Sequence, residues 1–131
     1  GKAAKYVGGT IATLPEKTQG KLDLQEGAAV FVAKNDTKLT IPYAKIESLE
    51  YGQKAGRRVG VALAVNPLFL FSKKRKHFLT IGFLDEAGKK QGAVLELAKG
   101  VVRETLSTLE TKSGKKVEYE SEEAKKHAEK Q

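Results

Sequence analysis

Short segments in which apolar and polar residues alternate follow one another closely through the first half of the chain. Leu22 and Leu24 alternate with Lys21, Asp23 and Gln25, which is the period-two pattern of a strand with one buried face. Residues that favour turns, such as Pro, Gly, Asn and Asp, separate the segments. We therefore expect five short strands, at residues 6–14, 21–25, 28–34, 39–41 and 46–53. Strands at such close spacing are typical of a β-sandwich or a small barrel.

The alternating pattern returns after residue 77 and then gives way to a helical one. Residues 78–83 and 91–97 are predicted to be strands, joined by a loop whose Gly88 can adopt positive φ, and they bring the total to seven. Val102, Leu106 and Leu109 then follow at i, i+4 and i+7, the apolar stripe of an amphipathic helix over residues 100–112. Gly114 is placed to end this helix.

Positive charge is concentrated in one quarter of the chain. The net charge is +8, from 24 Lys and Arg against 16 Asp and Glu. Residues 51–84 contribute +7 of it, because seven basic residues stand there without an acidic one. Such clustering favours an anionic partner, either a membrane surface or a nucleic acid, although a solvated basic loop has the same composition.

This basic region interrupts the β pattern, and we call residues 54–76 the insertion. Its uncharged centre runs for 13 residues, from Val59 to Phe71. Residues 59–65 alternate like a strand but also have the spacing of a short helix, which we expect here. Asn66 and Pro67 are suited to start a second short helix. The residues that stand out are Arg57, Arg58, Leu68, Phe69, Leu70, Phe71, Lys73, Lys74, Arg75 and Lys76.

These ten residues are predicted to contact an anionic lipid surface. A helix that spans a bilayer needs about 20 apolar residues, so the insertion is too short to cross. It can lie at the interface, since each buried Leu or Phe contributes roughly 1.5–3 kcal/mol and each nearby cation about 1 kcal/mol. Two alternatives stay open: the apolar side chains pack onto the domain's own core, or they form a protein–protein or homo-oligomeric interface. Nucleic acid ranks behind these, because the aromatic residues do not alternate with the basic ones.

Few residues suit catalysis, a metal or a cofactor. The chain has no Cys, which excludes disulfides, thiolate zinc sites and Cys nucleophiles. His77 and His127 are its only histidines, so a metal site would need carboxylates from elsewhere in the chain. No nucleophile elbow, phosphate-binding loop or dinucleotide fingerprint is found. We therefore expect a non-catalytic protein without a cofactor, and the sequence identifies no small-molecule substrate.

The sequence leaves the cellular compartment open. The chain contains no Met and begins at Gly1. This beginning is compatible with a processed, exported protein and equally with a truncated chain. Peripheral membrane association is expected only if the predicted lipid contact is correct.

Three stretches of the chain resemble one known group of domains. The segment LTIPYAKIESLEYG, from Leu39 to Gly52, is similar to the central part of bacterial pleckstrin-homology-like (PH-like) and GRAM-like domains, where a strand ends at a tight corner and a second strand follows. The segment KKRKHFLTIGF, from Lys73 to Phe83, is similar to the strand that follows the insertion. Leu95, Val102 and Leu106 match the last strand and the helix. The resemblance covers about residues 6–112.

This resemblance implies a mainly β fold: a seven-stranded bent barrel or sandwich, capped by one C-terminal amphipathic helix, with the insertion before the last hairpin. It implies a domain at residues 6–114, preceded by a frayed lead-in and followed by a charged tail at residues 115–131. It also implies a non-catalytic binding module, often found at membranes. Members that bind phosphoinositides carry basic residues after the first strand, whereas here the loop from Leu14 to Gly20 has only Lys17. Membrane contact is therefore expected from the insertion.

Overall fold

Two antiparallel meanders make up most of the protein. The computed structural model describes residues 2–11, 13–15, 17–52, 64–65, 77–119 and 125–126. In the first meander β1 (Lys2–Gly9), β2 (Thr18–Leu24), β3 (Ala28–Ala33) and β4 (Lys38–Pro42) pair in succession. In the second, β5 (Ile46–Gly52) pairs with β7 (Phe78–Leu84), and β7 pairs with β8 (Lys90–Leu97).

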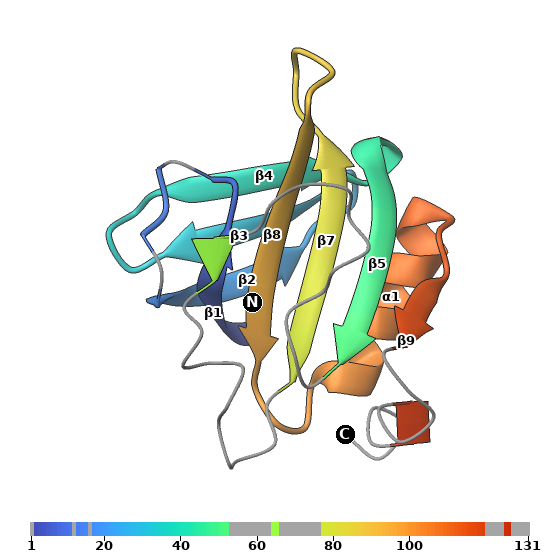
Figure 1. Cartoon of the computed structure of the whole chain (residues 1–131). Coiled ribbons are helices and arrows are strands. Elements are labelled where there is room, and N and C mark those ends of the chain that lie inside the picture. Colours follow the sequence, from blue (N-terminus) through green and yellow to red (C-terminus); the bar gives the residue numbers. More distant parts are fainter. Residues whose placement is uncertain are drawn as a thin grey trace.

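Strand β1 joins the two meanders into one sheet (Figure 1). It pairs with β8 from Ala4 to Gly9, and the register shifts between Tyr6 and Gly8. Such a bulge bends a strand and increases its twist. Residues Lys2 to Tyr6 also pair with β2, whereas Gly8 and Gly9 pair with the two-residue strand β6 (Ala64–Val65). The first strand thus changes partner where it bends.

Helix α1 (Val102–Ser113) covers the core that the bent sheet encloses. Its buried residues are Val102, Thr105, Leu106 and Leu109, which include the predicted apolar stripe. Gly114 ends the helix in the left-handed conformation, with φ of 75°, and its N–H donates to the Glu110 carbonyl. The helical stripe and its C-terminal glycine are therefore confirmed.

Two short elements occupy the end of the fold near the helix. The corner after Pro42 is the 3-10 turn η1 (Tyr43–Lys45), and the Tyr43 hydroxyl donates to the Gln25 carbonyl at 2.6 Å. Strand β9 (Val117–Tyr119) pairs in parallel with β5. The Glu110 carboxylate accepts a hydrogen bond from the Val117 N–H at 2.7 Å, which links β9 to α1.

The expectation of a mainly β fold with one C-terminal helix is confirmed. The seven predicted strands correspond to β1–β5, β7 and β8. The expected closure into a barrel is wrong: the strand order runs β4-β3-β2-β1-β8-β7-β5-β9, so among the described strands β4 and β9 form the two edges of an open sheet. The chain turns directly from β4 through η1 into β5, and β9 rather than β4 pairs with the outer side of β5.

Two local expectations are also wrong. Residues 2–5 form the first half of β1 instead of a frayed lead-in, because all four pair with β2, and Ala4 and Lys5 also pair with β8. Ala64 and Val65, within the stretch expected to be helical, form β6, since the bend of β1 leaves backbone groups of Gly8 and Gly9 for another strand. The remainder of that stretch lies outside the described residues.

Substitution of Gly9 tests the close approach of β1 to β8. Gly9 has φ of 145°, and a Cβ there would lie 2.3 Å from the Gly92 carbonyl oxygen. We expect Gly9→Ala to lower the free energy of unfolding by roughly 2–4 kcal/mol, measured by urea denaturation. The control is Gly27→Ala, because nothing lies within 4 Å of that position. Equal midpoints for the two variants would contradict this packing.

Candidate functional site

All ten residues predicted to contact lipid lie outside the part of the chain that the structure describes. They are Arg57, Arg58, Leu68, Phe69, Leu70, Phe71, Lys73, Lys74, Arg75 and Lys76. The structure does describe the two ends of this region. Gly52, the last residue of β5, pairs with Phe78, the first residue of β7. The intervening chain therefore leaves and re-enters the sheet at neighbouring points.

A buried aromatic cluster lies where the chain re-enters the sheet. The Tyr51 hydroxyl is 2.8 Å from Nδ1 of His77, and the two side chains are 0% and 8% exposed. Tyr119 of β9 packs edge-on against Tyr51, with ring centroids 6.1 Å apart. Burial raises the pKa of Tyr51 to about 12. The ends of three elements, β5, β7 and β9, are thus joined at the base of the insertion.

The face of β7 that points away from the core is also buried. Leu79 and Ile81 of β7 belong to the core. Phe78 and Thr80, one position out of phase with them, are also only 1% exposed. Because successive side chains of a strand point to opposite faces, β7 is buried on both. A lipid or protein partner is therefore expected to meet the domain elsewhere.

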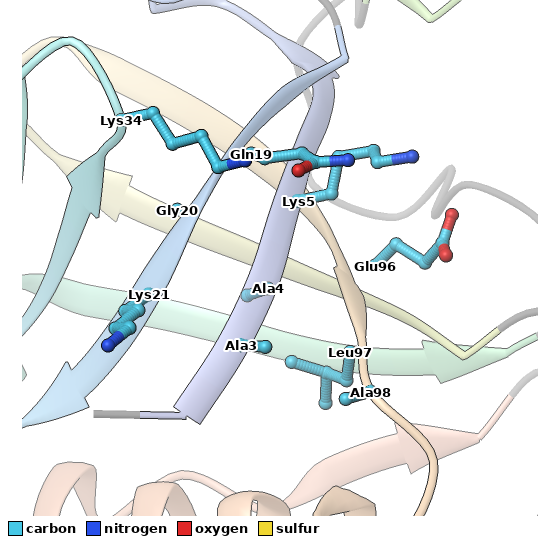
Figure 2. A pocket seen from close by; sticks show the side chains of 10 residues that line it. All are labelled: Ala3, Ala4, Lys5, Gln19, Gly20, Lys21, Lys34, Glu96, Leu97 and Ala98. Atoms are coloured by element: carbon cyan, nitrogen blue, oxygen red, sulfur yellow. The ribbon is translucent and has the colours of Figure 1, made fainter.

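Three lysines surround a depression of about 390 Å³ on the first meander (Figure 2). Lys5 comes from β1, Lys21 from β2 and Lys34 from the residue after β3. Glu96 of β8 lies on the opposite side. We call this site the basic depression; its lining is Ala3, Ala4, Lys5, Gln19, Gly20, Lys21, Lys34, Glu96, Leu97 and Ala98.

Strand register and small residues shape the basic depression. Lys5 pairs with Gln19 and Ala3 with Lys21 across β1 and β2, and the Lys34 N–H donates to the Gln19 carbonyl at 2.9 Å. Ala3 lies on the same face, because it is two positions from Lys5 and pairs with Lys21. Its short side chain leaves space between the lysines, whereas Gly20 faces the core, where a Cβ would lie 2.9 Å from the Phe31 ring.

The three lysines outnumber the acidic side chains around the basic depression, where Glu96 is the cross-strand neighbour of Lys5. Within the described residues, none of the three side chains makes an ion pair or a hydrogen bond. Three cations and the single carboxylate of Glu96 leave a formal charge of +2 around the depression. Such a site can attract phosphate or carboxylate groups, and its apolar floor can accept a small apolar group beside them.

Reasoning from the sequence missed the basic depression. Lys5, Lys21 and Lys34 are far apart in the chain, and only the register of β1, β2 and β3 brings them together. The prediction that residues 1–5 are a frayed lead-in also removed Lys5 from consideration. Aligning residues 2–6 with 18–22 as an antiparallel pair would have placed Lys5 and Lys21 on one face.

No protein-family model matches the chain, and no curated protein matches its sequence. Among the described residues, no three His, Asp or Glu side chains gather in a way that could hold a metal ion. No helix in this part of the chain is both long and apolar enough to cross a membrane. The function is therefore argued from the basic depression and the insertion.

The raised pKa of Tyr51 can be measured directly. Its value in the folded protein lies above the usual 10, so the folded state keeps a proton that the unfolded chain loses. This contribution to stability is complete below pH 10 and is lost as the pH rises through about 12. We expect the tyrosinate absorbance difference between the wild type and Tyr51→Phe to titrate near 12. A midpoint near 10, with far-UV circular dichroism unchanged, would contradict the burial.

Proposed function

We propose that this protein is a PH-like, non-catalytic binding module that associates with anionic membrane surfaces through the insertion and the basic depression. The observation that carries the proposal is the group of three lysines, Lys5, Lys21 and Lys34, on one surface, none of which forms an ion pair with a described residue. It adds a second cationic site to a chain that already carries +7 within residues 51–84.

The order of elements supports the PH-like assignment. A four-stranded meander is followed by three further strands and a helix whose apolar stripe packs on the core. The insertion precedes the β7–β8 hairpin, and the corner at Tyr43 follows a strand that ends at Pro42. Each of these features is one that the resemblance implies. Open sheet edges at β4 and β9 are compatible with a module that binds partners through its surface.

The expected binding free energies favour membrane attachment through the basic depression and the insertion together. Each lysine near an anionic leaflet contributes about 1 kcal/mol, so the basic depression supplies about 3 kcal/mol. That energy alone corresponds to weak, salt-sensitive attachment. Leu68, Phe69, Leu70 and Phe71 would each add roughly 1.5–3 kcal/mol if they enter the interface. Reversible membrane attachment therefore needs both the cations and the apolar residues.

Vesicle co-sedimentation tests the proposal. We expect the wild type to pellet with phosphatidylserine-containing vesicles and to stay in solution with phosphatidylcholine alone. Replacement of Lys5, Lys21 and Lys34 by Gln should weaken binding by about two orders of magnitude, which corresponds to about 3 kcal/mol. The control replaces Lys99, Lys115 and Lys116 by Gln; these lysines are exposed and the change in net charge is the same.

A second variant tests the insertion. Phe69→Ser with Phe71→Ser should weaken pelleting while preserving the dependence on salt, because the cations remain. If the wild type and both variants pellet equally, the proposal is wrong. A concentration-dependent oligomer that the phenylalanine variant dissolves, without any effect of lipid, would instead support the protein–protein alternative.

A further inference from the structure

Strand β4 presents a backbone edge that no described strand pairs with. The Ala33 N–H donates to the Thr37 carbonyl at 2.8 Å, and the Tyr43 N–H donates to the Gly27 carbonyl at 3.3 Å. With the β3–β4 register, these two bonds show that the odd-numbered residues of β4 bond to β3. Lys38 and Thr40 therefore direct their N–H and C=O groups to the opposite side. No described strand pairs there, since β4 ends the strand order.

A pocket of about 450 Å³ runs along this edge. We call it the edge pocket. Both Leu39 and Thr40 line it, although successive side chains of a strand point to opposite faces. A cavity that touches both therefore meets β4 at its edge. Ile11 and Phe83 complete an apolar wall on the side of the core. The volume lies within the usual range of ligand pockets.

The far wall of the edge pocket is held rigidly by a chain of hydrogen bonds. The Thr10 hydroxyl donates to Oε1 of Gln91, and Gln91 Nε2 donates to the Asp85 carboxylate at 2.9 Å. Asp85 also accepts the N–H groups of Ala87 and Lys89, each at 2.9 Å. The Gln91 amide and the two N–H groups lower the pKa of Asp85. These hydrogen bonds connect the residue after β1 to the β7–β8 hairpin along this wall.

We propose that the outer edge of β4 binds an extended segment of a partner protein, which adds one antiparallel strand and inserts an apolar side chain into the edge pocket. Main-chain hydrogen bonds to Lys38 and Thr40 would hold the segment, and the pocket would select its side chain. An antiparallel addition continues the pairing found throughout the first meander. This site shares no lining residue with the basic depression, so it does not depend on the proposed membrane contact.

The charge of Lys38 and the antiparallel register restrict the sequence of the partner segment. The exposed side chain of Lys38 stands at one end of the edge, and a cross-strand neighbour of opposite charge is favourable. In an antiparallel pair, the partner residue opposite Leu39 is followed directly by the one opposite Lys38. The partner therefore needs an apolar residue followed by an acidic one. Pro42, which lacks an N–H, limits the pairing to a short motif.

A second copy of this chain fits the edge poorly. Pro42 and Lys38 are the residue types that discourage edge-to-edge pairing, and each copy carries a net charge of +8. An acidic segment avoids the charge repulsion, and a short one pairs with Lys38 and Thr40 without reaching Pro42. Lys38 and Pro42 thus favour an acidic partner segment by disfavouring pairing between two copies of this chain.

Amide NMR titration with a synthetic peptide tests the proposal. The probe is an acetylated and amidated heptapeptide with leucine at its centre, glutamate directly after it, and serine and threonine elsewhere. We expect saturable shifts at Lys38, Leu39, Thr40 and Phe83, with slower hydrogen exchange at the Lys38 and Thr40 amides. Two control peptides replace the central leucine by serine or carry N-methyl groups on both residues that flank the leucine. Both should lose binding.

Two protein variants complete the experiment. Thr40→Pro removes an N–H that points away from β3, so the fold should persist while peptide affinity falls about tenfold. Thr40→Val keeps the N–H and should bind like the wild type. Equal binding of the N-methylated peptide, equal affinity of Thr40→Pro, or shifts confined to other strands would overturn the proposal. So would the absence of saturable binding by the wild type.

Discussion

The pairing of β1 with β8 is the interaction on which the rest of the fold depends. It is the link that turns two separate meanders into one sheet. The link requires a bulge at Val7 and a residue without a side chain at Gly9, where the backbone of Gly92 approaches closely. Once β1 is bent in this way, the two halves of the sheet face each other and create the space that α1 fills.

The two ends of the strand order differ in how their strands are paired. The outer edge of β5 is occupied by β9, which is held by the Glu110 carboxylate and by Tyr119 packed against Tyr51. At the other end of the strand order, β4 keeps its edge open beside a preformed pocket. This difference follows from the chain order, because β9 comes directly after α1 and pairs with β5.

Features that depend on residues close together in the chain were predicted from the sequence. The basic depression was not, because its lysines come from different strands. The stripe of Val102, Leu106 and Leu109 and the terminal Gly114 predicted the helix closely, since a helix is stabilised by contacts between residues three and four apart. The basic depression was not predicted, because Lys5 and Lys21 meet only through the register of a hairpin. The apolar and basic residues of the insertion were identified from composition alone, and their role remains a proposal.

The sequence by itself determined the elements: alternating segments for strands, one amphipathic helix, and a net positive charge concentrated within residues 51–84. These features depend on short-range periodicity and on composition, which a single chain displays directly. Only the tertiary structure decided that the sheet stays open, that β1 changes partners at Gly8, and that three distant lysines share one surface. Those outcomes depend on register and on which edge each returning segment reaches, and both are set by packing between residues far apart in the chain.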